Sequence, residues 1–307
     1  MLDIRRLRLL LELERRGTIT AAARAVNYTP SAVSQQLTAL EREAGVALLE
    51  RDGRRVRLTP AARVLTRRTD QIISDLEAAE MELAAGRVEP RGSVIAGAFP
   101  TAAERLLIPA LAAVVKRYAA IEPAIRQVLP EEGIELLRSG ELDVLVAKAY
   151  DHVPAPRSGG LERHHLLSEE LLVALPVDHP LAGRPLALAE LEEEKWIAGE
   201  PATVFGEVVR QACLVAGYEP QIVHRAEEVA VQLALVSGGA GVALVPRLGC
   251  SPPVAGVSLS PITRPRLERH VFALVRRGAE RRPEIRTVLE ALIDQAARAS
   301  EELSLGS

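Results

Sequence analysis

Residues 29–45 place hydroxyl, amide and guanidinium groups at the spacing of one helix face. Thr29 is a typical capping residue, Pro30 follows it at the first helical position, and Gly45 ends the segment. An apolar stripe that would face a core is formed by Val33, Leu37 and Leu40. The opposite face carries Ser31, Ser34, Gln35, Thr38 and Arg42.

Short hydroxyls and amides on an exposed helix match the donors and acceptors that base pairs present in the major groove of DNA. Gln can pair with adenine through two hydrogen bonds, and Ser and Thr adapt to several bases. The face therefore predicts base reading by Ser31, Gln35 and Thr38, with phosphate contacts from Ser34 and Arg42. The alternative is an ordinary solvated face, which would more commonly carry Glu, Lys and Arg.

The preceding elements have the order of a helix-turn-helix. Residues 4–16 predict an amphipathic helix that ends at Gly17, and residues 18–26 predict a short helix whose alanines allow close packing. Asn27 and Tyr28 form the turn. A polar-faced helix in third place has the position of a recognition helix.

A basic hairpin follows. Val46–Leu49 and Arg55–Leu58 predict two short strands, and Asp52-Gly53 is a strong hairpin-turn signal. Arg51 and Arg54 near the tip can reach phosphates or a minor groove, as in the wing of a winged helix.

Charge and composition limit the class of protein. Residues 1–60 hold 11 Arg against 7 acidic residues, although the whole chain has a formal net charge of −3. This distribution favours one polyanion-binding end on an acidic body. The N-terminus is apolar but studded with charges, unlike a signal peptide, and no stretch reaches the length of a membrane span. We expect a cytoplasmic protein without a membrane partner.

A long helix is predicted from Thr59-Pro60 to about Ala85. Its apolar positions alternate at spacings of four and three, as in a coiled-coil seam with one polar member, and are Leu65, Thr69, Ile72, Leu76, Ala79 and Leu83. The members expected to contact the same helix of a second copy are Leu65, Ile72, Leu76 and Leu83. The alternative is an amphipathic helix packed on its own domain. Residues 86–92 predict a linker.

Beyond residue 92, short aliphatic runs alternate with amphipathic helices, which predicts an α/β body. Strands are expected at residues 93–100, 143–147, 169–176, 195–200, 221–226, 241–246 and 269–277. A closing helix is expected over residues 283–303.

The sequence contains only weak signals for a metal site, a catalytic nucleophile or a phosphate-binding loop. Cys213 and Cys250 are far apart and too few for a disulfide framework or a zinc site. No pair of histidines has metal-ligand spacing on a clear helix, and the adjacent His164 and His165 would point to opposite faces of a strand. The glycine-rich run 238–246 lacks the ending of a phosphate loop. We therefore predict no metal, cofactor or catalytic residue.

Residues 4–60 resemble the DNA-binding domain of LysR-type transcriptional regulators. The most specific motifs are SAVSQQLTALE at residues 31–41, followed by G-V-x-L-L-E-R and L-T-P-A. Weaker features further along are SGELDV at 139–144, DHPLA at 178–182 and GGAGVALVP at 238–246. Their order and spacing also resemble the family.

The resemblance implies a multidomain α+β fold with three parts. These are a winged helix-turn-helix at residues 1–58, a dimerising linker helix at 59–88, and a two-lobe α/β effector domain at 92–300 that resembles type 2 periplasmic binding proteins. The family commonly assembles as a homotetramer, a dimer of dimers, and binds a small molecule between the lobes.

Within that effector domain, lobe I is placed at about 92–166 plus 268–300, and lobe II at about 167–267. At the recognition helix, the family often has a polar residue at position 30 and a proline at position 31, whereas this chain has Pro30 and Ser31. Proline has no donor, so no base contact is carried onto Pro30.

A ligand site is expected where strands end at the cleft between the lobes. Thr101 is placed to cap the helix after strand 93–100, and a helix N-terminus favours an anion. Lys148 follows strand 143–147 and should emerge at the same edge; the alternative is a surface lysine. The candidate effector-binding residues are Phe99, Pro100, Thr101, Ala102, Lys148, Glu200 and Thr203. The expected effector is a small carboxylate, such as an amino acid or an aromatic acid.

The sequence favours a DNA-binding transcriptional regulator that is not an enzyme. Its expected partners are double-stranded DNA, a small-molecule effector and further copies of itself. The alternative is a cytoplasmic solute-binding protein, or an enzyme on the two-lobe body, with the N-terminal domain as an appendage. An appendage has no need of a base-reading face beside a basic hairpin, so the first 60 residues distinguish the two.

Overall fold

A computed structural model describes residues 2–26, 28–52, 55–66, 68–69, 72–73, 76, 89–154, 160–201 and 203–305. The chain divides into two compact units, residues 1–88 with 277–282 and residues 89–276 with 283–307. Each unit has its own hydrophobic core. The described residues include no helix that is both long and apolar enough to cross a membrane.

The N-terminal unit begins with three helices, α1 (Ile4–Arg16), α2 (Ile19–Ala25) and α3 (Pro30–Ala44). Thr18 and Thr29 cap the second and third helices through their side chains, and Gly45 ends α3 in the left-handed region at φ 68°. The helices bury one aliphatic core that includes Leu10, Leu13, Val33, Leu37 and Leu40. The predicted helix-turn-helix order is confirmed.

A two-stranded hairpin follows, β1 (Leu49–Asp52) and β2 (Arg55–Leu58). The first strand begins at Leu49 rather than at Val46, so that part of the prediction is wrong. A carboxylate on α3 explains the difference. The backbone N–H groups of Leu48 and Leu49 donate to Glu41 at 2.9 and 3.0 Å, which anchors the start of the hairpin to the helix.

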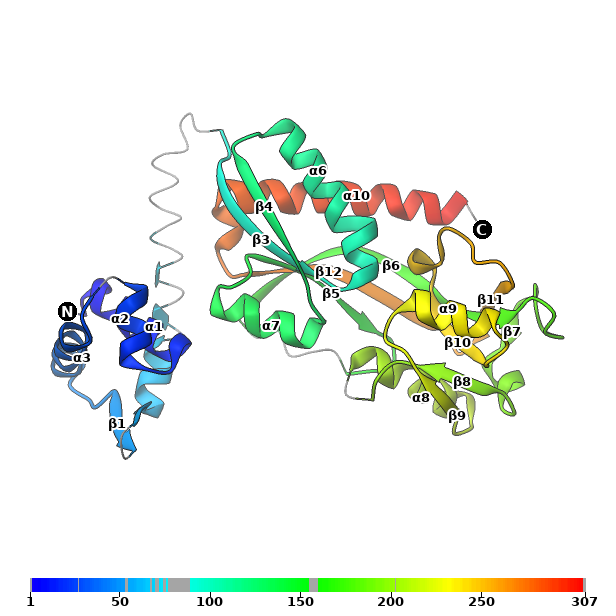
Figure 1. Cartoon of the computed structure of the whole chain (residues 1–307), viewed down its shortest axis with the longest axis horizontal. Helices are drawn as coiled ribbons and strands as arrows, with labels where there is room; N and C mark the ends of the chain where they lie inside the picture. Colours follow the sequence, from blue (N-terminus) through cyan, green and yellow to red (C-terminus); the bar gives the residue numbers. More distant parts are fainter. Residues whose placement is uncertain are drawn as a thin grey trace. The chain divides into compact units, whose positions relative to one another are not determined.

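The C-terminal unit is built on one mixed sheet with the strand order β4-β3-β5-β12-β6-β10-β8-β9 (Figure 1). The strands are β3 (Gly92–Ala98), β4 (Ile121–Gln127), β5 (Val144–Tyr150), β6 (Leu161–Pro176), β7 (Leu186–Ala187), β8 (Lys195–Ala198), β9 (Gln221–Arg225), β10 (Val242–Pro246), β11 (Val257–Arg264) and β12 (Glu268–Arg276). The predicted α/β fold class is confirmed. Strands β4, β7 and β11 were not predicted. Charged residues and prolines obscure the strand pattern of β4 and β11, and β7 has only two residues.

Helices cover both faces of this sheet. They are α5 (Pro100–Ala102), a π-helical turn η1 (Ala103–Leu107), α6 (Ile108–Arg117), α7 (Pro130–Ser139), α8 (Val204–Ala216), α9 (Val229–Ser237) and α10 (Pro283–Leu305). Short 3₁₀ segments are η2 (Leu188–Leu191), η3 (Arg247–Cys250) and η4 (Ala279–Arg281). In Figure 1, α10 and α6 lie on one side of β3, β4 and β5, and α7 lies on the other.

Strand β6 runs through both halves of the sheet. Its residues 161–170 pair with β12, and its residues 171–176 pair with β10 and β11. We call the half with β3, β4 and β5 lobe I, and the half with β8, β9 and β10 lobe II. The two lobes are therefore joined by β6 and by the passage from β11 into β12.

We predict that Gly206→Ala distorts the start of α8. A Cβ at Gly206 would lie 1.7 Å from the backbone oxygen of Glu200, so the backbone has to move. The expected loss of unfolding free energy is about 3 kcal/mol, the upper end of ordinary overpacking costs. Chemical denaturation measures it. Gly238→Ala is the control, because its added Cβ meets nothing nearer than 3.5 Å; equal stability of the two variants would contradict the prediction.

Candidate functional site

The polar face of α3 is exposed as predicted. Val33, Leu37 and Leu40 are buried, while the side chains that lie exposed on the other side are Ser31, Ser34, Gln35, Thr38 and Arg42. The Thr38 hydroxyl donates to the backbone oxygen of Ser34 at 3.0 Å, so it offers its lone pairs to an outside donor. The Ser31 and Gln35 side chains make no hydrogen bond to another described residue.

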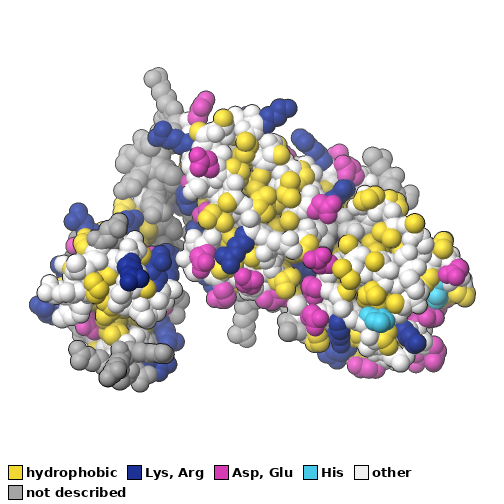
Figure 2. All heavy atoms as spheres, viewed as in Figure 1, with side chains coloured by type: hydrophobic (Ala, Val, Ile, Leu, Met, Phe, Trp, Pro, Cys, Tyr) yellow, Lys and Arg dark blue, Asp and Glu magenta, His cyan; other side chains and the backbone are white. Residues whose placement is uncertain are grey.

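Neighbouring side chains fix the orientation of this helix. Arg6 of α1 donates to Gln36 at 2.9 Å and forms an ion pair with Glu43. On the visible face of the N-terminal unit, Arg side chains predominate over Asp and Glu (Figure 2). Arg54 lies outside the described residues, and nothing is described of the Arg51 side chain. Their phosphate contacts stay predictions.

The predicted seam of the linker helix is described in part. Residues 60–66, 68–69, 72–73 and 76 are helical, and Leu83 lies outside the described residues. Leu65 is half-buried against the core of the N-terminal unit. Ile72 and Leu76 are 48% and 43% exposed within the single chain, so they are available to a partner.

A small cavity of about 20 Å³ lies between the two lobes. Four of the predicted effector-binding residues line it, Phe99, Pro100, Thr101 and Lys148. The residues lining it that the sequence did not single out include Tyr150, Phe205, Glu227, Val229 and Arg269. Strands β5 and β12 and the starts of α5, α8 and α9 therefore contribute to one site.

Three predicted residues do not line the cavity. Ala102 is fully buried. Glu200 and Thr203 act through another residue, because the Glu200 backbone N–H and the Thr203 hydroxyl donate to Glu227 Oε2 at 3.2 and 3.0 Å. They position the Glu227 carboxylate at the wall of the cavity.

The predicted cap of α5 is wrong. Phe99 is the N-cap residue and makes no side-chain capping bond, so Thr101 lies inside the first turn. Pro100 takes the first helical position, where its fixed φ fits and its missing N–H costs nothing. Thr101 therefore presents its side chain to the cavity from within the helix rather than from its cap.

Lys148 is buried inside β5, which contradicts its predicted position after the end of a strand. The strand continues to Tyr150, and Lys148 is 6% exposed. Its Nζ lies 4.8, 5.8 and 4.7 Å from the ring centroids of Phe99, Tyr150 and Phe205. Among the described residues no group accepts a hydrogen bond from it. Burial, and secondarily the charge of Arg269, lowers the pKa of Lys148 from 10.5 to about 8.

A fully buried ion pair stands beside this lysine. Arg269 Nε donates to Glu169 Oε1 at 2.9 Å, and its Nη2 donates to the same oxygen. The second oxygen of Glu169 accepts from the backbone N–H of Leu248 at 2.6 Å. The side chains of Arg269 and Glu169 are 1% and 2% exposed. Both oxygens of the Glu169 carboxylate thus accept hydrogen bonds, and its negative charge pairs with Arg269 rather than with Lys148.

Two further carboxylates bear on the cavity. Glu227 Oε1 is buried without a hydrogen-bond partner within the described part of the chain. Glu131, on α7 of lobe I, accepts from the backbone N–H of Val204 at the start of α8 in lobe II, at 2.9 Å. This bond joins the lobes directly and places an anion at a helix N-terminus, where it is favoured.

Arg269, Glu169 and Glu227 had little signal in the sequence as residues of a binding site. Charged residues in aliphatic strands are ordinarily placed at strand ends or on solvent faces. One signal was the position of Arg269 in β12, two residues before a run of five buried aliphatic or aromatic residues that begins at Val271. Arg269 can be paired with Glu169 only when the register between β6 and β12 is known, and the sequence alone does not provide it.

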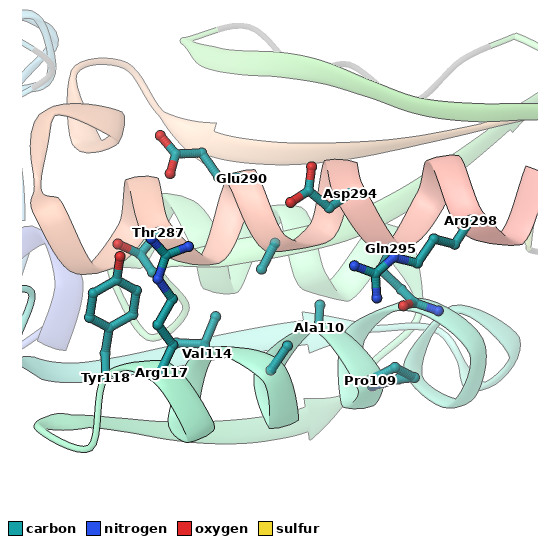
Figure 3. A pocket seen from close by; sticks show the side chains of 12 residues that line it. Pro109, Ala110, Val114, Arg117, Tyr118, Thr287, Glu290, Asp294, Gln295 and Arg298 are labelled. Atoms are coloured by element: carbon teal, nitrogen blue, oxygen red, sulfur yellow. The ribbon is translucent and has the colours of Figure 1, made fainter.

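A larger surface groove of about 220 Å³ runs between α6 and α10 (Figure 3). Arg117, Tyr118, Glu290, Asp294 and Arg298 are among the side chains around it. The Arg117 guanidinium lies 5.3 Å from the centroid of the Tyr118 ring. Charges of both signs lie around this groove, so it offers no single-sign site comparable to the buried ammonium of Lys148.

The two thiols are both buried and belong to separate cores. Cys213 packs in the cluster under α8, and Cys250 packs in the cluster under α9. Burial raises the pKa of Cys213 to about 11 and that of Cys250 to about 12. Thiols of this kind are poor nucleophiles.

We predict that Arg269→Met destabilises the C-terminal unit by about 3–5 kcal/mol, because it leaves the Glu169 carboxylate buried and unpaired. Adding Glu169→Gln should recover part of the loss, since an amide still accepts from Leu248 without carrying a charge. Denaturant unfolding of the single and double variants measures both steps. A double variant no more stable than Arg269→Met would show that the charge is not the cause.

Comparisons with known proteins agree with this architecture. Residues 4–63 match the model described as "Bacterial regulatory helix-turn-helix protein, lysR family", and residues 87–297 match "LysR substrate binding domain". The transcriptional dual regulator GltC of Bacillus subtilis is 26% identical over 296 residues, 95% of this chain and 97% of GltC. A probable hydrogen peroxide-inducible genes activator of Mycobacterium avium is 28% identical over 244 residues, 78% of this chain and 76% of that protein.

A solved structure has the same fold over nearly the whole chain. Full-length OxyR from Pseudomonas aeruginosa, a variant form, superposes with a TM-score of 0.72 at 20% identity and covers 96% of this chain and 95% of its own. At that identity the likeness concerns the fold. The two family matches together span most of the sequence. The chain therefore belongs to the LysR family of bacterial transcriptional regulators, in which a DNA-binding helix-turn-helix domain is joined to a domain that binds a small-molecule effector.

Proposed function

We propose that α3 reads base edges through Ser31, Gln35 and Thr38, and that Ser34 and Arg42 contact phosphates. Their exposure on one face of a well-capped helix supports this assignment. Arg51 and Arg54 of the hairpin are assigned to phosphates on sequence grounds. The helix is held by contacts of Arg6 and Glu41 on its other sides, so the polar face remains available to DNA.

The proposal also covers the three segments of the chain and its assembly through the linker helix. We infer a DNA-binding domain at residues 1–58, a linker helix at 59–88 and an effector domain at 92–300. In a cytoplasmic homodimer, or a dimer of dimers, Ile72 and Leu76 would pair with their counterparts, together with Leu65 and Leu83. The exposure of Ile72 and Leu76 in the single chain supports this pairing.

We predict that Gln35→Ala weakens binding to the specific operator by about 1–3 kcal/mol and relaxes preference at one base pair. Gln36→Ala is the matched control, because the Gln36 amide already bonds to Arg6. Binding to operator and to random DNA is compared by fluorescence anisotropy. An equal loss on both kinds of DNA would show that Gln35 does not read a base.

We infer that the cavity between the lobes binds the effector through a carboxylate that pairs with Lys148. The buried ammonium of Lys148 carries this proposal. A buried charge without a hydrogen-bonding partner is costly, and three aromatic rings compensate it only in part. The lowering of its pKa from 10.5 to about 8 corresponds to roughly 3 kcal/mol. An anion in the cavity would remove that cost.

A carboxylate in the wall of the cavity, that of Glu227, limits the class of ligand that fits. Glu227 Oε1 is buried without a donor in the described part of the chain, and it lines the same cavity. A ligand that carries an ammonium or another donor beside its carboxylate would satisfy both Glu227 and Lys148. This favours an amino acid over a simple aromatic acid. The cavity of about 20 Å³ implies that the lobes separate to admit it.

Sensing through a thiol is less consistent with these residues. The relative from Mycobacterium avium is described as a probable hydrogen peroxide-inducible genes activator. Reactive cysteines have lowered pKa values and partial exposure. Both thiols in this chain are buried with raised pKa values, so we infer that the response depends on binding rather than on oxidation.

We predict that Lys148→Met stabilises the ligand-free protein at pH 7 by up to about 3 kcal/mol while abolishing stabilisation by the effector. A thermal-shift screen of amino acids and small aromatic carboxylates supplies the ligand. The control is Lys195→Met, since Lys195 is exposed on β8. A Lys148→Met variant that still gains stability from the same compound would refute the assignment.

We predict that the affinity for the anionic effector falls as the pH rises above the pKa of Lys148. Below about pH 8 Lys148 is protonated in the free protein, so affinity for an anion is at its full value. Above that pH the free protein must take up a proton to bind, and affinity falls by up to about tenfold per pH unit. Calorimetry across this range tests the assignment, and affinity that rises with pH would contradict it.

A further inference from the structure

A second polar cluster lies on the opposite face of the strands that carry the ion pair. Arg269 and His270 are neighbours in β12, and adjacent strand residues point to opposite faces of a sheet. Their register partners in β6 are Glu169 and Ser168. Arg269 bonds to Glu169 on the cavity face, and His270 bonds to Ser168 on the reverse face.

Three potential metal ligands meet on this reverse face. Asp151 follows the end of β5, and Glu268 and His270 open β12. One ligand atom from each lies within 4.8 Å of the others, and all three residues are half-buried. His270 Nε2 is 3.1 Å from Asp151 Oδ1. The Glu268 carboxylate has neither a hydrogen bond nor an ion pair with any described residue, which leaves two carboxylates beside one imidazole.

We propose that Asp151, Glu268 and His270 bind a divalent transition-metal ion of the Zn²⁺ class. Zinc–nitrogen and zinc–oxygen bonds are about 2.0–2.2 Å long, so adjacent ligand atoms of a tetrahedral site lie roughly 3.3 Å apart. The 3.1 Å separation of His270 Nε2 from Asp151 Oδ1 is close to that edge. Rotation of the Glu268 side chain brings the third ligand in, and water fills the remaining position.

The surroundings of His270 suit a metal ligand. Its Nδ1 lies 2.9 Å from Ser168 Oγ, which in turn lies 3.0 Å from His165 Nε2. If Nδ1 donates to Ser168 and the Ser168 hydroxyl donates to His165, the lone pair of Nε2 is free to face the metal. Hydrogen bonding at the far nitrogen is how ligating histidines are oriented in metal sites.

An irregularity in β6 makes this arrangement possible. The register with β12 shifts between Val271, which pairs with Leu167, and Phe272, which pairs with His165. One extra residue, Leu166, is thereby inserted into β6. The insertion turns His165 to the same face as Ser168, so that the chain of hydrogen bonds can form.

The mixed donor set indicates which cations are bound. Mg²⁺ and Ca²⁺ favour six or more oxygen ligands, whereas an imidazole with two carboxylates suits Zn²⁺, Co²⁺ or Mn²⁺. A metal here would fasten the strand that returns from lobe II to the end of β5. Two hydrogen bonds already join these segments: the Asp151 backbone N–H donates to the Glu268 carbonyl oxygen at 3.1 Å, and Asp151 Oδ2 accepts from the Glu268 backbone N–H at 3.1 Å.

Metal binding by the tag-free, chelator-treated full chain tests the proposal. Calorimetry with Zn²⁺ should show one site per chain, and Co²⁺ should give the visible absorption of a tetrahedral complex. His270→Gln and Asp151→Asn should each weaken binding by at least about 10–100-fold, and His165→Ala should weaken it within that range. His224→Gln, an exposed histidine on β9, is the matched control and should bind as the wild type does.

Folding is checked separately by thermal unfolding without metal, and Glu268→Gln supplies a variant that removes no hydrogen bond of the cluster. Zn²⁺ should raise the unfolding temperature of the wild type but not of these variants. Absence of saturable Zn²⁺ binding by the wild type would overturn the proposal. So would unchanged affinity in both His270→Gln and Glu268→Gln, because the ion would then be held elsewhere.

Discussion

The buried ion pair between Glu169 and Arg269 joins the two strands through which the lobes are connected. Glu169 lies in β6 at the point where that strand leaves β12 for β10, and Arg269 lies near the start of β12. With the backbone N–H of Leu248 as a third partner, the pair also reaches into lobe II. A buried pair of this kind is weak evidence for high stability, because desolvation offsets much of the attraction. Its stronger effect is on register: a slip of one residue in β12 would bury an unpaired charge.

Lys148 depends on that arrangement. Because Arg269 occupies the Glu169 carboxylate, the lysine is left among aromatic rings, and no described group accepts a hydrogen bond from its ammonium. Arg269 also adds to the lowering of the Lys148 pKa. The protein thus keeps a destabilising charge at the wall of a cavity, which is typical of residues retained for binding rather than for folding. The apolar rings exclude water, so an anion that enters meets the lysine in a medium of low dielectric constant.

Local signals in the sequence were sufficient for much of the N-terminal unit. Thr29, Pro30 and Gly45 mark both ends of α3, and the periodicity of Val33, Leu37 and Leu40 identifies its buried face. The start of β1 was misplaced because it depends on Glu41, a carboxylate on another element. The effector site was harder to predict for the same reason. Glu169 and Arg269 are 100 residues apart, and Lys148 breaks the rule that charges mark the end of a strand. Asp151 and His270 are likewise brought together only by strand pairing.

The bond from Glu131 to Val204 stabilises the joined arrangement of the lobes, so it opposes the separation that we propose for effector entry. The Glu131 carboxylate of lobe I accepts from the backbone N–H of Val204 at the start of α8, a position where a negative charge is favoured. The conformational equilibrium between joined and separated lobes then sets the apparent affinity, which equals the intrinsic affinity multiplied by the fraction of molecules that are open. With the effector bound between the lobes as proposed, sequence changes on α7 that remove the Glu131 bond would in this way shift the effector concentration at which the regulator responds.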